Sequence, residues 1–201
     1  MTHRRHFLLF AAASGVALAA RPGLAQGTQK AAAFVKSTGD QLVAIVNGPG
    51  SAEQKRAAMT RVINSAVDVD GVGRFCLGRY WRQATPQQQK EYLRLFHEVL
   101  VTNITAKLGE YQGVSFQMDR SHMQDENAVV STTVNRPNNP PTAVDWVIAN
   151  PNSSPKIIDV VAEGTSLRLT QRSDYASYLV HNNNNVEALI TAMKNQISQN
   201  G

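Results

Sequence analysis

Apolar residues recur with two different periods in this chain of 201 residues, and the switch between the two constrains the fold most. From Pro86 to Tyr111 they recur at every third or fourth position, which predicts a long amphipathic helix with a broad apolar face. After Tyr111 apolar and polar residues alternate, which is the period of strands. The helical stripe consists of Leu93, Phe96, Leu100, Ile104, Leu108 and Tyr111, broadened by Leu95 and Val99.

The alternation after Tyr111 predicts five short strands. They lie at about residues 114–117, 130–134, 144–149, 157–162 and 166–170. Links rich in Asn, Asp and Pro separate them. Because consecutive strands with short links pair with one another, the pattern predicts an antiparallel meander with helices on one face, in an α+β fold.

Helical spacing also precedes this region. It predicts two short amphipathic helices, over residues 34–45 and 59–66, separated by Gly48-Pro49-Gly50. Ser51 and Gln54 have the spacing of a capping box, in which each side chain bonds the backbone N–H of the other residue. The second helix should therefore begin just after Ser51.

Thr85 and Gln88 repeat the capping-box spacing, with Pro86 at the first helical position. Two further helices are predicted at residues 171–181 and 186–199. Four consecutive Asn residues at 182–185 join them, and Asn tolerates the left-handed conformation. This run is interpreted as a turn and helix cap.

Residues 1–25 have the composition of an export signal peptide. Arg4 and Arg5 precede an uncharged apolar run, Phe7–Ala20, and Gly23-Leu24-Ala25 is a small-x-small cleavage pattern. The order Arg-Arg-His-Phe-Leu also fits a twin-arginine signal, and the general export route stays open. The apolar run is shorter than the roughly 20 residues that span a membrane. Residues 26–201 are predicted to form one domain.

The net charge of +5 says little about partners once this leader is set apart. Arg4, Arg5 and Arg21 lie in it, which leaves 17 basic against 15 acidic side chains. No dense run of Lys and Arg remains, so nucleic acid is not a predicted partner.

Potentially reactive side chains do not form a catalytic or metal-binding motif. Cys76 stands between two large apolar residues, which favours a small buried hydrophobe over a nucleophile. Asp68 and Asp70 could form an acid–base pair, but capping of the following helix is favoured. The mature histidines lie on different predicted elements and lack metal-ligand spacing; they are His97, His122 and His181. The sequence therefore predicts no enzyme, no metal site and no cofactor.

Two segments in a fixed order carry a family resemblance. They are Leu77-Gly78-Arg79-Tyr80-Trp81 and Asp159-Val160-Val161-Ala162-Glu163-Gly164-Thr165-Ser166-Leu167. Together they resemble the MlaC (toluene-tolerance) family of periplasmic phospholipid carriers, over about residues 68–197. The resemblance implies an antiparallel NTF2-like curved sheet packed with helices and enclosing an apolar lipid cavity.

The resemblance also implies a function. The expected role is a periplasmic lipid-binding carrier that shuttles phospholipid, as cargo, between the outer and inner membranes. The implied partners are an outer-membrane lipoprotein of the MlaA type and an inner-membrane ABC transporter complex with an MCE-domain subunit of the MlaD type. HpnM-like hopanoid-associated proteins look similar, so a hopanoid or another lipid remains an alternative cargo. A non-lipid interaction module is the other alternative.

The lipid tails are predicted to lie between the long helix and the apolar strand faces. Apolar stripes of this kind also suit an ordinary core, so the cavity depends on the resemblance. Which face of residues 157–162 lines it stays open, because that run is apolar on both sides. The candidate lipid-binding residues are Phe96, Leu100, Ile104, Leu108, Phe116, Val130, Trp146, Ile148, Val160 and Leu167.

Leu77–Trp81 is predicted to be a structural hinge between helices. Gly78 would permit a close turn, and the ring of Trp81 is expected to be buried. Arg79 is expected to pair with a carboxylate or a helix C-terminus, with a headgroup phosphate as the alternative.

Overall fold

The computed structural model describes the backbone of residues 22–200. Most of the predicted signal peptide, residues 1–21, lies outside the described residues. The first helix begins at Pro22 and continues through Ala25, the predicted cleavage position. No helix among residues 22–200 is both long enough and apolar enough to cross a bilayer.

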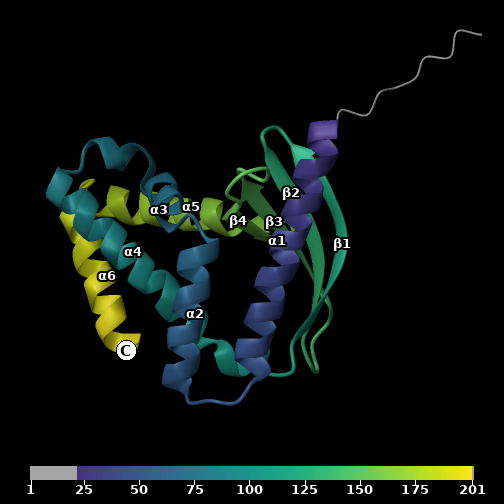
Figure 1. Cartoon of the computed structure of the whole chain (residues 1–201). Helices are drawn as coiled ribbons and strands as arrows, with labels where there is room; N and C mark the ends of the chain where they lie inside the picture. The colour runs from purple at the N-terminus through teal and green to yellow at the C-terminus, as the bar shows by residue number, and fades with distance from the viewer. Residues whose placement is uncertain (1–21, 201) are drawn as a thin grey trace, which may run out of the picture.

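Helices surround one end and one face of an antiparallel sheet (Figure 1). The helices are α1 (Pro22–Asn47), α2 (Ala52–Ala66), α3 (Val69–Leu77), α4 (Pro86–Ala106), α5 (Leu167–His181) and α6 (Val186–Asn200), with 3-10 turns η1 (Gly78–Arg82) and η2 (Leu108–Tyr111). The strands are β1 (Ser115–Gln124), β2 (Asn127–Asn135), β3 (Thr142–Ala149), β4 (Lys156–Ala162) and β5 (Thr165–Ser166). Their order in the sheet is their order in the chain, so the predicted meander is confirmed.

Local capping explains where several helices begin. Ser51 and Gln54 form the predicted capping box of α2, and Thr85 and Gln88 form that of α4. Asp68 accepts a hydrogen bond from the backbone N–H of Gly71 at the start of α3, so it acts as a cap. These boundaries follow from side chains three residues apart and therefore need no tertiary contact.

The turn between α5 and α6 uses the left-handed conformation expected of Asn. Asn183 and Asn184 have φ angles of +55° and +57°. The backbone N–H of Asn184 donates to the carbonyl of Leu179 at 2.7 Å, which satisfies a carbonyl at the end of α5. The predicted turn is confirmed.

The strands pair with a register that places one set of apolar residues on the inner face. Phe116 pairs with Val134, Val130 with Trp146, and Trp146 with Val160. The register shifts between Met118 and Ser121, where two residues of β1 lie opposite the single residue Ser131 of β2, and again between Val147 and Ile148. The second shift places both Ile157 and Val160 on the inner face.

Two separate clusters of buried apolar side chains form the core. The helical cluster joins α2, α3, α4, α5 and α6, together with the end of α1. The sheet cluster joins the first half of α1 and the end of α2 to the inner face of the sheet. Figure 1 shows the same division: α1 runs along β1 and β2, whereas α4 and α6 lie on the other side of α2.

Several predicted boundaries are wrong. The first helix spans Pro22–Asn47 instead of 34–45, and the first strand spans Ser115–Gln124 instead of 114–117. The long helix ends at Ala106 instead of Tyr111, and the chain continues as the 3-10 turn η2 around Gly109, a poor helix former. The last predicted strand, 166–170, is mostly helix: α5 begins at Leu167. The Ser166 side chain caps it by accepting from Leu169 N, and the Asp159 carboxylate accepts from Arg168 N. The alternation of Leu167 and Leu169 predicted a strand, but the hydrogen bonds that cap the helix at Ser166 and Asp159 outweigh this preference.

Candidate functional site

The helical cluster is closed by aromatic rings. Tyr92 is fully buried and packs with Phe96 and Tyr175, with ring centroids 5.9 to 6.4 Å apart. Its hydroxyl donates to the carbonyl of Gly73 on α3 at 2.9 Å. Burial raises the pKa of both tyrosines above its ordinary value, so both phenols stay protonated. This part of the molecule is a fixed scaffold.

Cys76 lies in the same cluster and is 1% exposed. Burial, together with the nearby charge of Asp159, raises the pKa of its thiol to about 12. A thiolate is the reactive form, so this thiol is inert near neutral pH. The interpretation of Cys76 as a small buried hydrophobe is confirmed.

The sheet cluster is built from smaller side chains. Ala31 and Val35 of α1 and Ala66 of α2 face four strand residues, all 5% exposed or less; these are Ala128, Val130, Ile148 and Ile157. Six further side chains pack around this centre and are only partly buried; they are Phe34, Val67, Met118, Met123, Trp146 and Val160. The aromatic rings and the methionines of the sheet cluster therefore lie at its margin instead of its centre.

Strand β2 crosses from one cluster to the other. Val130 belongs to the sheet cluster, whereas Val134 on the same face packs against the helical cluster. Between them Thr132 is 1% exposed. Its hydroxyl donates to the carbonyl of Val144 at 3.1 Å and accepts from the Trp146 indole N–H at 2.9 Å. The seam between the clusters is thus lined mainly by apolar side chains, and the Thr132 hydroxyl and the Trp146 indole N–H beside it are already hydrogen-bonded.

The structure distributes the predicted lipid-binding residues among four environments. Val130 and Ile148 lie in the sheet cluster, with Trp146 and Val160 packed against them. Phe96 lies in the helical cluster, with Leu100 and Leu108 packed against it. Phe116 is half-buried against Gly39 of α1. Ile104 and Leu167 are 38% and 53% exposed. The expected pairing of Leu167 with a strand face is wrong, because this residue begins α5.

Sequence reasoning missed the part that α1 plays at this face. Its apolar stripe predicted an amphipathic helix, which α1 is, but gave no sign that it covers β1 and β2. The short side chains Ala31 and Gly39 let the helix approach closely: a Cβ on Gly39 would lie 2.4 Å from the ring of Phe116. Small residues at i and i+8 of the helix were the available signal.

The segment Leu77–Trp81 is a tight connection between α3 and α4. Gly78 has a φ of +59°, a conformation that suits glycine. Tyr80, 2% exposed, is the buried ring, and its hydroxyl donates to Asn184 Oδ1 at 2.8 Å. Trp81 is only partly buried, so its expected burial is wrong. Arg79 donates to the Tyr80 hydroxyl at 2.9 Å instead of pairing with a carboxylate.

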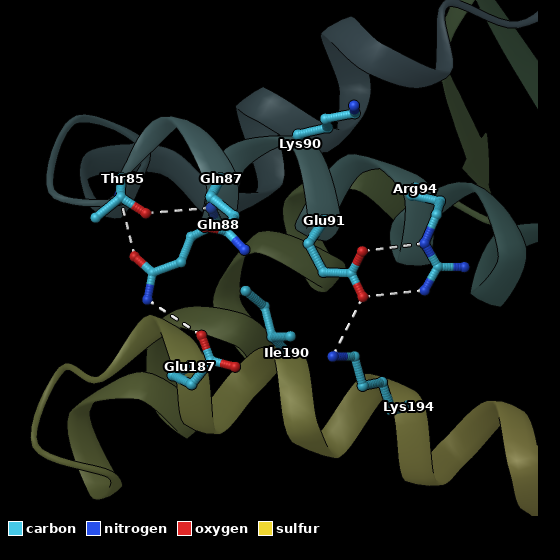
Figure 2. Close-up of a pocket in the computed structure, with 9 residues that line it drawn as sticks. All are labelled: Thr85, Gln87, Gln88, Lys90, Glu91, Arg94, Glu187, Ile190 and Lys194. Carbon is cyan, nitrogen blue, oxygen red and sulfur yellow. Dashed lines mark hydrogen bonds and ion pairs between the residues drawn. The ribbon is translucent and has the colours of Figure 1, made fainter.

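A polar groove of about 780 Å³ lies between α4 and α6 (Figure 2). Figure 2 shows Glu91 held between Arg94 and Lys194, at 3.1 and 3.2 Å, and Gln88 bonded to Glu187. Hydrogen bonds from Arg94 and Lys194 lower the pKa of Glu91 to about 2. Because these charged groups pair with one another, we interpret the groove as a polar contact between α4 and α6 and not as a ligand site.

A second groove, of about 460 Å³, runs between α1 and α2. Its floor includes Ile45 and Val62, and Gln41 and Arg61 stand at its rim. Neither groove contains the predicted lipid-binding residues.

The remaining candidate groups do not converge. His97 contacts Asn64, His181 contacts the carbonyl of Ser177, and His122 points to the outer face of β1. Within residues 22–200 no three His, Cys, Asp or Glu side chains gather as a metal site would require. The arrangement offers apolar surface and fixed hydrogen bonds, without a cluster of reactive groups.

Comparison with known proteins agrees with this geometry. A phospholipid-binding protein from Ralstonia solanacearum, solved in complex with a phospholipid, superposes with a TM-score of 0.71 over 84% of this chain and 97% of its own, at 22% identity. The predicted α+β fold with an antiparallel curved sheet packed by helices is therefore confirmed.

Sequence comparison identifies a relative and a matching protein family. The toluene tolerance protein ttg2D from Pseudomonas putida is 23% identical over 144 residues, which is 71% of this chain and 67% of that protein. The family model described as MlaC protein matches residues 36–195, which include all ten candidate lipid-binding residues. The chain therefore belongs to the MlaC family.

Proposed function

We propose that this protein is a periplasmic carrier that binds one phospholipid and shuttles it between the outer and inner membranes. Residues 1–25 would direct its export and be removed. Its partners would be an MlaA-type lipoprotein at the outer membrane and an MlaD-type ABC transporter complex at the inner membrane. Family membership supports this role, as does the phospholipid bound to the Ralstonia solanacearum relative.

The observation that carries the proposal is the seam between the two clusters. A diacyl lipid exposes some thirty methylenes at about 0.8 kcal/mol each, so a carrier must bury both tails. Half-buried apolar side chains lie at the margin of the sheet cluster, and Leu100 of α4 and Val134 of β2 are partly buried against the helical cluster. Separation of the two clusters along this seam would expose one continuous apolar face to the tails.

The proposed site keeps most of the residues predicted from the sequence and drops two. Ile104 and Leu167 are excluded because they are 38% and 53% exposed. The helical side is Phe96, Leu100 and Leu108, and the sheet side is Phe116, Val130, Trp146, Ile148 and Val160.

Val160 provides the sharpest test, because it is half-buried whereas Ile148 is fully buried and would unfold the protein if made polar. Val160→Asn should reduce copurified phospholipid several-fold, since an amide buried beside hydrocarbon costs about 1–3 kcal/mol. Val161→Asn is the matched control, because Val161 points to the opposite face of β4. Lipid is measured by solvent extraction and mass spectrometry, and circular dichroism checks the fold.

Three results would contradict the proposal. Equal phospholipid in folded Val160→Asn and wild type would place the site elsewhere. Hopanoid masses in the extract would change the cargo. An extract without lipid would leave an interaction module.

A further inference from the structure

The junction of α3, η1 and α5 gathers arginines around Phe75. The Cζ atoms of Arg168 and Arg172 lie 4.6 and 4.8 Å from the centroid of the Phe75 ring. A Cβ on Gly78 would lie 3.2 Å from the Nε of Arg172, so the guanidinium rests against the backbone of η1. Stacking engages the flat faces of these groups and leaves their N–H edges available.

Carboxylates neutralise only part of this cluster. Arg168 Nε lies 3.3 Å from Asp159 Oδ2, and Arg74 lies 3.8 Å from Asp70. Among the ion pairs of residues 22–200, none involves Arg79 or Arg172. Arg79 stacks on the ring of Tyr80 at 4.9 Å. The fold thus assembles a net positive surface from segments about ninety residues apart in the sequence.

An exposed leucine borders these arginines. Leu169, in the first turn of α5, is 56% exposed. On a helix, residues three apart are neighbours, so Leu169 lies beside Arg172. Leu167, in the same turn of α5, is 53% exposed, so two large apolar side chains are exposed to water at the end of α5 that carries Arg168 and Arg172.

The shape of this surface argues for an extended partner. Neither groove described above borders it, since one lies between α4 and α6 and the other between α1 and α2. Small ligands bind in concave sites, and the hot spots of protein interfaces are poor in leucine. A bilayer offers phosphates to arginine edges and an apolar boundary to leucine at the same depth.

We propose that the surface formed by Phe75, Arg79, Leu169 and Arg172 docks on membranes rich in anionic phospholipid headgroups. Phosphate oxygens would accept hydrogen bonds from Arg172 and from the N–H groups of Arg79 that do not bond the Tyr80 hydroxyl. Leu169 would enter the boundary between headgroups and acyl chains. The docking needs no cargo, so it stands or falls separately from the proposed carrier function.

Vesicle flotation tests the charge requirement. Wild type should float with vesicles of phosphatidylcholine and phosphatidylglycerol, should not float with phosphatidylcholine alone, and should be released by salt. Arg172→Gln should weaken binding about fivefold, since an arginine near an anionic surface contributes about that factor. Arg172→Lys keeps the charge and should retain most of the binding.

Arg61→Gln is the matched control for charge, because Arg61 is an exposed arginine on α2 at the rim of the other groove. It should float as wild type does. Copurified lipid should be unchanged in Arg172→Gln, which separates loss of docking from loss of cargo. Melting temperatures verify that each variant remains folded.

A second pair of variants tests the apolar requirement. Leu169→Asn should weaken flotation about tenfold, in keeping with the burial of a leucine side chain. Val180→Asn is its control, because Val180 is also 56% exposed but lies at the other end of α5. Wild type that ignores anionic vesicles would overturn the proposal and leave the surface to an acidic protein. Folded Arg172→Gln and Leu169→Asn variants that float normally would overturn it as well.

Discussion

The helical cluster and the sheet cluster bury apolar surface in different ways. In the helical cluster two large rings are fully enclosed: Tyr92 is 0% and Tyr80 2% exposed, and both hydroxyls are bonded. In the sheet cluster the fully buried positions are taken by smaller residues such as Ala31 and Ala128, and the rings of Phe34 and Trp146 stay at the margin.

The difference separates rigidity from adaptability within one domain. A ring that is wedged on all sides and hydrogen-bonded has one arrangement, because close-packed interiors transmit strain instead of absorbing it. Half-buried rings and flexible Met118 and Met123 can repack at small cost. The proposed cargo would therefore be accommodated by the sheet side, while the helical side keeps the fold.

The largest expected effect compares one ring from each cluster. Tyr92→Ala should lower the free energy of unfolding by about 3–5 kcal/mol, because it leaves a cavity and removes the hydrogen bond between Tyr92 and the Gly73 carbonyl. Trp146→Ala should cost less than half as much, since its ring is already partly exposed. Urea denaturation of both variants measures the two values. Equal losses would show that the sheet cluster is as tightly closed as the helical one.

A smaller effect compares two helical glycines. A Cβ on Gly73 would lie 3.0 Å from Leu93 and Phe96, inside the aromatic packing, so Gly73→Ala should destabilise by about 1–2 kcal/mol. Gly39→Ala should stay within about 1 kcal/mol of wild type, because the ring of Phe116 can turn away and alanine favours the helix. Thermal melts of both variants measure the two losses of stability. A larger loss for Gly39→Ala than for Gly73→Ala would show that the contact between α1 and the sheet is the more rigid of the two.

The smallest effect concerns the ion pairs of Glu91 in the groove between α4 and α6. The pKa of Glu91 is lowered from 4.5 to about 2, so its ion pairs stabilise the fold above pH 4.5 and are lost as the pH falls toward 2. Glu91→Gln should melt slightly below wild type near neutral pH, and the difference should shrink in acid. A difference that grew on acidification would mean that the carboxylate does not stabilise the folded state.

Elements fixed by local chemistry were predictable from the sequence. Capping boxes at Ser51 and Thr85 place two helix starts, and alternation places four strands. The packing partners of each apolar face were not predictable, because a period reveals that a face is buried but not what covers it. This is why the sequence pattern led to the long helix α4 being expected against the strands, whereas the helix that covers β1 and β2 is α1.

The strand at 157–162 shows a second limit. Ile157 pairs with Ile148 and Val160 with Trp146, so two residues three positions apart share the inner face. Alternation by two cannot produce this, and only the register shift at Val147 does. The arginine surface has the same character, since Arg172 comes to lie against Gly78 only in the folded chain and the sequence shows no dense basic run.

The register shift in β1 has a consequence for how copies of this protein behave toward one another. Within residues 22–200 no strand pairs with the outer edge of β1, whereas Val67 and β5 occupy the opposite edge of the sheet along β4. Asp119 and Arg120 fall at the shift, so charges and an irregular backbone interrupt the open edge. Such interruptions prevent two sheets from joining edge to edge into aggregates. A domain that keeps part of its apolar surface loosely packed is thereby protected from self-association at its most vulnerable strand.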